Sequence, residues 1–209
     1  MEFEEVSAAI LALFPRLDET EQRVSLALYR LLAKQMPGSD PELADAAGIA
    51  PREAERILRS CPTVQRSDDG LIIGYAGLTT AETRHRMRFD GMEVYGWCAW
   101  DTLFLPELLG VSVQVRSSCG GTGQAVALTV HADGVECAGA TPWISLAAPS
   151  PAAAADIQKR FCCQVHFFVD QRRGEAWVAG HPRRFLATLE QAWQLGRRRN
   201  ALHYSESLA

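Results

Sequence analysis

The sequence has few basic side chains, above all near its start. It holds 21 Lys and Arg against 25 Asp and Glu, which gives a net charge of −4. Residues 1–80 carry 8 basic and 13 acidic side chains and are therefore net −5, whereas residues 81–209 are net +1. Nucleic-acid affinity depends largely on Lys and Arg that neutralise phosphates. The charge therefore argues against a nucleic-acid partner.

Long apolar runs are also missing. No stretch approaches the ~20 residues that a membrane-spanning helix needs. The first residues, Met-Glu-Phe-Glu-Glu, lack the basic region of a signal peptide. With 47% hydrophobic and 22% charged residues, the composition is typical of a globular protein. We expect a cytoplasmic protein without a membrane partner.

Cysteine is too scarce for a fold that depends on disulfides. Six cysteines in 209 residues are far fewer than the roughly 8–10% of small disulfide-rich domains, and the Cys-x-x-Cys spacing common in structural zinc sites does not occur. In a reducing compartment these side chains should be thiols, either buried as small hydrophobes or used as soft ligands and nucleophiles. They are Cys61, Cys98, Cys119, Cys137, Cys162 and Cys163.

The first eighty residues have helical patterns that end in a hairpin. Apolar residues recur at helical spacing, Pro37-Gly38 and Gly48 are breaks, and Ser67-Asp68-Asp69-Gly70 is a turn signal. Helices followed by a small hairpin indicate a winged-helix-like module over residues 1–80, and the acidic charge favours a packing or lid role for it. We expect helices at 3–13, 19–35, 41–47 and 51–59, with strands at 63–65 and 71–75.

Residues 81–209 change to strand patterns, with tight turns predicted at Asp90-Gly91 and Asp133-Gly134. Because helices and strands are segregated, the expected fold class is α+β: the helical module, then a mostly antiparallel sheet core with flanking helices as a catalytic domain. The expected strands are 84–89, 92–95, 111–116, 124–131, 135–138, 143–146, 163–169 and 176–178, and the expected helices are 156–160 and about 182–198.

Cys98 and Asp101 follow a predicted strand where a helical turn begins. Free N–H groups and the positive end of the helix dipole at such a place favour a thiolate over a thiol. Asp101 should lie one turn later on the same face. A carboxyl in a water-poor pocket beside a thiolate has a raised pKa and can donate a proton near neutral pH. The pattern Cys-x-x-Asp is not specific by itself, because a buried cysteine beside a helix-capping aspartate would look the same.

Cys162 and Cys163 lie at the start of a predicted strand, where alternation separates their side chains. Cys163 shares a face with Val165, Phe167 and Val169, which is the composition of a core, and is expected to be an inert packed cysteine. Cys162 shares the other face with Gln164 and His166. Cys162 is therefore the better candidate for a polar site.

The remaining cysteine, histidine and arginine residues give weaker indications of a functional site. Cys119 precedes a glycine turn and is expected to be a structural thiol, while Cys61 and Cys137 have no partner pattern. Four of the histidines, at 85, 131, 181 and 203, have no catalytic spacing. The run from Arg197 to Arg199 is interpreted as a solvated helix end.

Two segments resemble the organomercurial (alkylmercury) lyases of bacterial mercury resistance. They are Gly-Trp-Cys-Ala-Trp-Asp-Thr-Leu-Phe at residues 96–104 and Phe-Cys-Cys-Gln-Val-His-Phe-Phe at residues 161–168, with Cys119 between them. Their order and approximate spacing, the chain length and the helical first third are similar to the family, so the resemblance spans nearly the whole chain.

The resemblance implies cleavage of R–Hg–X to R–H and Hg(II), with Cys98 and Cys162 as essential cysteines, Asp101 as the essential aspartate and Cys119 as a further recurrent cysteine. It implies mercury as the metal held by Cys98, Asp101 and Cys162. No cofactor is expected, external thiols would be needed for turnover, and mercuric reductase would accept the Hg(II).

The residue types suit this chemistry in their own right. A soft cation prefers thiolates, two thiolates on mercury would weaken its bond to carbon, and Asp101 could supply the proton. Trp97, Trp100 and Phe168 would make an apolar pocket. The alternative is a zinc-binding or soft-metal-binding regulatory or structural protein that uses Cys98, Asp101, Cys162 and His166 as ligands.

Overall fold

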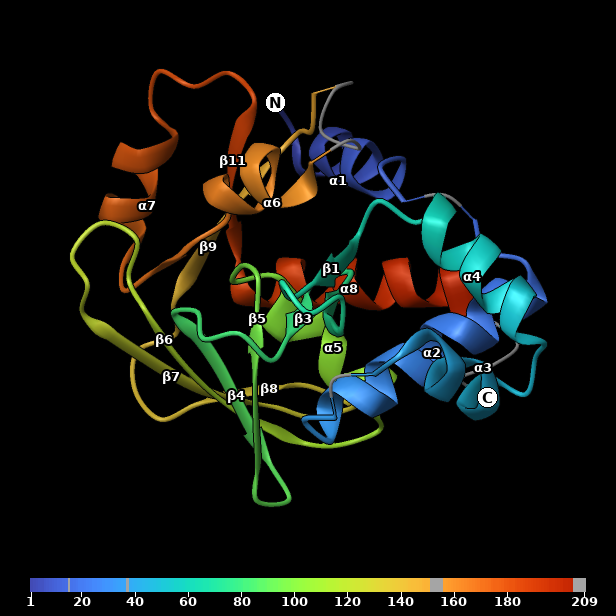
Figure 1. Cartoon of the computed structure of the whole chain (residues 1–209). Helices are drawn as coiled ribbons and strands as arrows, with labels where there is room; N and C mark the ends of the chain where they lie inside the picture. Colours follow the sequence, from blue (N-terminus) through green and yellow to red (C-terminus); the bar gives the residue numbers. More distant parts are fainter. Residues whose placement is uncertain (15, 37, 151–155, 205–209) are drawn as a thin grey trace.

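The computed structural model describes residues 1–14, 16–36, 38–150 and 156–204 (Figure 1). Four helices come first and strands dominate the middle, as the sequence predicts. The helices are α1 (Phe3–Leu11), α2 (Glu19–Ala33), α3 (Asp40–Ala47), α4 (Pro51–Ser60), α5 (Asp101–Leu109), α6 (Ile157–Arg160), α7 (Gln171–Val178) and α8 (Leu189–Tyr204), with a 3-10 turn η2 at Cys162–Gln164.

The strands form two antiparallel sheets. The larger has the order β1-β2-β3-β5-β4-β6-β7-β8, and the smaller has the order β10-β9-β11. The mixture of helices and antiparallel sheet confirms the expected fold class at this level. The strands are β1 (Val64–Arg66), β2 (Ile72–Tyr75), β3 (Leu78–Thr79), β4 (His85–Phe89), β5 (Met92–Gly96), β6 (Val113–Ser118), β7 (Ala125–Val130), β8 (Val135–Cys137), β9 (Trp143–Ala147), β10 (Phe167–Phe168) and β11 (Arg184–Thr188).

Local sequence signals explain several element ends. Asp18 and Ser39 accept backbone N–H bonds at the starts of α2 and α3, and Gly48 ends α3 in the left-handed conformation. Asp90 and Gly91 both have positive φ between β4 and β5. That backbone is the one that an Asp-Gly hairpin turn adopts, as the sequence predicts.

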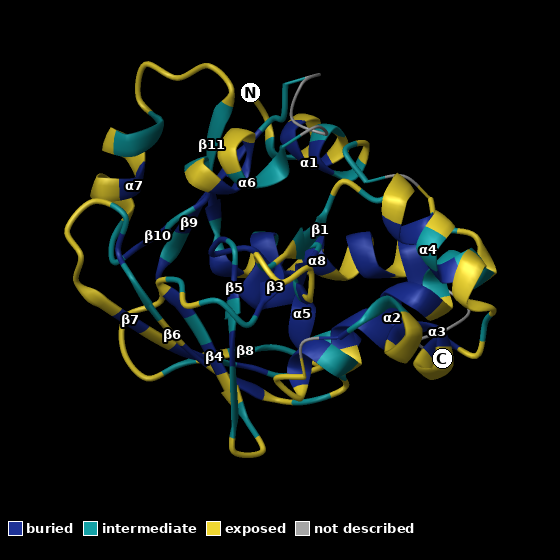
Figure 2. Cartoon of the chain, viewed as in Figure 1, coloured by how far each residue is buried: buried dark blue, intermediate teal, exposed yellow. Residues whose placement is uncertain are grey.

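The core lies between the sheets, where α5 and α8 pack on each other. Helix α5 also contacts β5 and β7, and α8 contacts β8, β9 and β11. Figure 2 shows α5 as mostly buried, and seven of its nine residues are buried. The loop that leads into α5 is therefore held from several sides. No helix among the described residues has the length and apolar character needed to cross a bilayer.

Three predictions for the last fifty residues are wrong. The residues expected as a strand at 163–169 form η2 and the short β10, and the expected strand 176–178 is the end of α7. The closing helix begins at Leu189 rather than near Pro182, because Arg184–Thr188 pairs with β9 as β11. Strand β3, which the sequence analysis did not identify, joins β2 to β5.

Candidate active site

Cys98 lies in the loop between β5 and α5, two residues before Trp100, the N-cap of α5. The loop is tied at both ends: Trp97 N–H donates to Gly77 O at 2.8 Å, and Trp100 Nε1–H donates to Ala192 O on α8 at 3.0 Å. Cys98 and Trp100 have no exposed surface. The sulfur of Cys98 is thus fixed in the core rather than on a mobile loop.

Asp101, the first residue of α5, turns back toward Cys98. Its Oδ2 accepts the backbone N–H of Cys98 at 2.6 Å, and the residue is only 5% exposed. Burial raises the pKa of the Asp101 carboxyl to about 7, although hydrogen bonds from Cys98 and the charge of Arg199 act in the opposite direction. This position confirms the expected closeness of the two residues, and the pKa is suited to a group that exchanges protons near neutral pH.

Cys162 comes to the site from the other end of the chain. It begins η2, directly after the buried Phe161. The two segments meet through the backbone, since Ala99 N–H donates to Val165 O at 3.4 Å. Ser145 braces the same turn, donating from Oγ to Gln164 O at 2.8 Å and accepting from His166 N–H at 3.0 Å.

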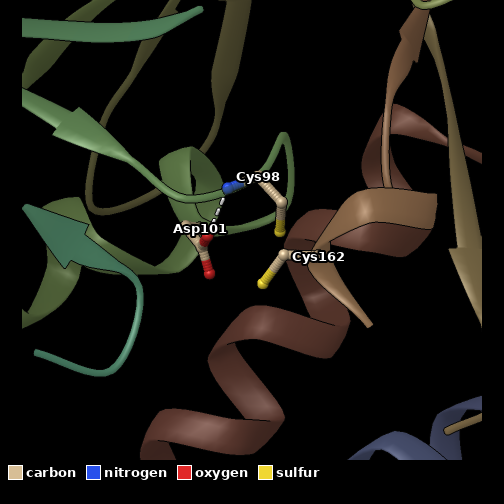
Figure 3. Close-up of side chains that lie close together, drawn as sticks. All are labelled: Cys98, Asp101 and Cys162. Carbon is tan, nitrogen blue, oxygen red and sulfur yellow. Dashed lines mark hydrogen bonds between the residues drawn. The ribbon is translucent and has the colours of Figure 1, made fainter. Parts of the chain in front are cut away.

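The three predicted site residues converge. One ligand atom from each of Cys98, Asp101 and Cys162 lies within 4.8 Å of the others, and all three residues are buried. Figure 3 shows the two sulfur atoms and the carboxylate pointing into one shared space. Two soft sulfur ligands beside a protonatable carboxyl suit a soft metal ion better than a hard one.

The prediction that helix α5 favours a Cys98 thiolate is wrong. Burial raises the pKa of Cys98 well above its ordinary value, and the hydrogen bond with Cys162 and the charge of Asp101 add to this effect. Cys162 also has a raised pKa: the hydrogen bond with Cys98 lowers it, but burial and the nearby Asp101 and Cys163 outweigh that bond. Desolvation by burial thus disfavours the thiolate form in the site.

Cys163 is not the packed core cysteine that strand alternation predicts. It is exposed, and its thiol donates to Lys159 O at 2.9 Å. The reason is that η2 replaces the strand, so residues 162 and 163 do not alternate across a sheet. The preference for Cys162 as the site cysteine nevertheless agrees with its position.

The other predicted residues lie outside the cluster. Cys119 is 2% exposed, and its backbone bridges to Phe167. His166 does not join the ligand group: its Nε2 lies 3.0 Å from Cys163 O, which can only accept, so Nε2 carries the proton. Among the described residues, the ligand group therefore consists of Cys98, Asp101 and Cys162 without His166, which the zinc-site alternative would need as a fourth ligand.

A pocket of about 380 Å³ opens beside Cys162, and its lining differs from the expected apolar one. Trp97 lines it, but Trp100 packs against Phe104 and Phe161, and Phe168 against His166 and Trp177. Polar groups dominate the rest of the wall. They include Gln65, Thr79, Thr83, Arg84, His85 and His166.

Arg199 was missed in the sequence. It was interpreted as part of a solvated helix end, yet it is 3% exposed, with its guanidinium 4.3 Å from the ring centroid of Phe104. Arg197 and Arg198 are exposed and pair with Glu107 and Glu4, as that interpretation predicts. The apolar Leu195 one turn earlier on the same helix was the available signal for a buried face.

Comparison with known proteins gives a consistent result. The family model for alkylmercury lyase (MerB) matches residues 78–200. An alkylmercury lyase of Staphylococcus epidermidis is 36% identical over 185 residues, covering 86% of this chain and 84% of the relative. An alkylmercury lyase of Pseudomonas putida is 37% identical over 172 residues, covering 82% and 80%.

The same family appears among solved structures. A crystal structure of the mercury-bound form of MerB2 superposes with a TM-score of 0.79 over 95% of this chain and 98% of that chain, at 21% sequence identity. At that identity the superposition bears on the fold. The family model and the close relatives decide the family, and this chain belongs to the alkylmercury lyases.

Proposed function

We propose that this protein is an organomercurial lyase that cleaves R–Hg–X to R–H and Hg(II). Cys98 and Cys162 bind mercury, and Asp101 delivers the proton to carbon. The observation that carries the proposal is the buried convergence of two thiols and a carboxyl within 4.8 Å in a member of this family. Soft thiolates are the ligands that a soft metal ion prefers.

The first step is a ligand exchange at Cys162, because this residue lines the pocket whereas Cys98 has no exposed surface. The Cys162 sulfur bonds to mercury, the Hg–X bond breaks, and the thiol proton leaves with X. Cys98 then bonds to mercury from the opposite side of the site, and its proton passes to the Asp101 carboxylate. The raised pKa of Asp101, about 7, allows it to hold that proton.

Cleavage uses the same proton. Two sulfur ligands increase the electron density on mercury and on the carbon bound to it, and the Asp101 proton is transferred to that carbon as the C–Hg bond breaks. The products are R–H and Hg(II) bound to two thiolates, and Asp101 is again a carboxylate that can contact the metal. The buried position excludes water, which strengthens the charge interactions within the site.

The test is hydrocarbon release. Purified protein incubated with a phenylmercury salt and excess thiol should release benzene catalytically. Release no faster than with thiol alone would contradict the proposed function.

We also propose roles for the rest of the chain. Residues 1–80 would form a winged-helix-like packing module without a nucleic-acid partner, and residues 81–209 the catalytic domain. The net charge of −5 and the order of helices followed by the β1–β2 hairpin support this. A fluorescence-labelled DNA duplex should show no binding at physiological salt, in contrast to a basic winged-helix protein.

For its setting, we propose a cytoplasmic enzyme without a resident cofactor, dependent on external thiols and passing Hg(II) to mercuric reductase. The six cysteines are free thiols, which suits a reducing compartment. Transfer of Hg(II) from the loaded protein to purified mercuric reductase, faster than to an equal concentration of small thiol, would be the expected result.

A further inference from the structure

The pocket beside Cys162 has unused hydrogen-bonding capacity. Trp97 Nε1 is buried and has no partner among the described residues. Arg84, at the rim, makes no hydrogen bond or ion pair with the described part of the chain, whereas Arg86 and Arg88 on the following strand both pair with Glu93. The free Arg84 guanidinium therefore borders the route to Cys162, and the unpaired N–H of Trp97 belongs to a residue that lines the same pocket.

The guanidinium of Arg84 is the main positive group of the pocket. Burial and the charge of Arg84 lower the pKa of His85, to about 3, and also that of His166, so both rings are neutral at pH 7. Glu82 also lines the pocket, but it is exposed and pairs with Arg86 at 3.7 Å. Arg84 is thus available for an anion that the chain itself does not supply.

The chemistry of mercury indicates which anion that is. In a reducing compartment a soft organomercurial cation is bound to a small thiol before it reaches the protein. Many small thiols carry a carboxylate a few bonds from the sulfur. A guanidinium binds a carboxylate through two parallel N–H bonds, and an indole N–H can add a third.

We propose that this pocket binds the carboxylate of the small thiol that carries the organomercurial, with Arg84 as the main contact and Trp97 Nε1 as a further donor. The inference rests on the proposed function. In the exchange, the bond between mercury and the carrier sulfur breaks and the bond to Cys162 sulfur forms. The Cys162 proton passes to the departing carrier, which leaves as a free thiol, so atoms and charge balance.

The experiment compares methylmercury bound to 3-mercaptopropionate, 2-mercaptoethanol or cysteamine, which place an anion, a neutral group or a cation beside similar sulfurs. Mercury capture is followed by tryptophan fluorescence in a stopped-flow instrument, and methane release is measured in parallel. Intrinsic differences between the thiols cancel when each rate ratio is compared between wild type and Arg84→Gln. Arg88→Gln is the matched control, because Arg88 lies on the adjacent strand outside the pocket.

The ratio of the capture rates for the carboxylate and neutral adducts should be roughly three- to tenfold higher in the wild type than in Arg84→Gln. This range lies between the effects of an exposed ion pair and of a charge-assisted hydrogen bond. The cysteamine adduct should change in the opposite direction, and Arg88→Gln should behave like wild type. Raising the salt concentration should shrink the preference of the wild type.

Equal ratios in wild type and Arg84→Gln would overturn the proposal, as would a wild-type preference that high salt leaves unchanged. The salt series needs no variant, so it decides the matter even if Arg84→Gln does not fold. Capture tests the carboxylate site, whereas methane release tests the lyase function. Normal carrier preference without methane would therefore contradict only the proposed function.

Discussion

The segments that supply the two sulfur atoms are held in different ways. Residues 96–104 lie in the core, with Cys98 and Trp100 fully buried and Asp101 5% exposed. In residues 161–168 the exposure changes between neighbours: Cys162 is buried, whereas Cys163 is exposed beside the pocket. The difference separates two tasks. In the proposed mechanism, the first segment shields the Asp101 carboxyl from water and the second receives the substrate.

Removal of either proposed mercury ligand should have the largest effect on the comparison between the two segments. Cys98→Ala and Cys162→Ala should each abolish benzene release, because neither sulfur can replace the other in a site with two sulfur ligands. Each truncation removes little volume, so the melting temperature should fall only slightly. Benzene release and thermal unfolding, measured on both variants, check this. Appreciable release by either folded variant would contradict a two-thiolate mechanism.

Asp101→Asn should separate binding from cleavage. Asn keeps the shape and can still accept the Cys98 N–H, but it cannot donate an acidic proton. Loss of general acid catalysis should lower hydrocarbon release ~10²–10⁴-fold while mercury binding persists. A residue that only caps the helix would behave differently, since Asn caps about as well as Asp. Near wild-type release would therefore remove Asp101 from the mechanism.

Gly77→Ala should disturb the buried segment without touching a sulfur. Gly77 has φ +105°, and a Cβ there would lie 2.6 Å from Asp101 Oδ1. The carboxylate must move, and the strained backbone costs about 1–3 kcal/mol of stability. We expect roughly tenfold slower release, an estimate based on how sensitive proton transfer is to position.

Gly110→Ala is the control for this variant. Gly110 also has positive φ, +67°, but no atom lies within 4 Å of the added Cβ. It should lose stability, and its rate of release should match that of the wild type. Equal rates for Gly77→Ala and Gly110→Ala would show that the approach to Asp101 has no catalytic importance.

Cys163→Ala should have the smallest effect. The residue is exposed, its thiol donates to Lys159 O, and it lies outside the ligand cluster of the described residues. Release should remain within about twofold of wild type, as for surface changes generally. If Cys163→Ala were folded and inactive while Cys162→Ala turned over, the assignment of the two neighbouring cysteines would be reversed.

Several misassigned elements had signals that could have been found. Asp170 accepts the N–H of Arg173 at 2.9 Å and starts α7, whose last residues were expected to be a strand. Thr188 and Gln191 exchange hydrogen bonds of 3.1 and 2.9 Å at the start of α8. A capping residue followed three positions later by Gln is a helix-start pattern. The expected helix was instead begun near Pro182, before this pattern.

The sequence by itself determined the helical first third, the antiparallel middle, and the identity of Cys98, Asp101 and Cys162 as candidates, because turn residues, periodicity and the two motifs are local. Only the tertiary structure decided in which direction the pKa values of the site shift and which residues surround it. The raised pKa of Cys98 and Asp101, the exposure of Cys163 and the position of Arg84 in the pocket depend on which distant residues pack nearby. Desolvation and pairing are properties of the folded environment, which local spacing does not encode.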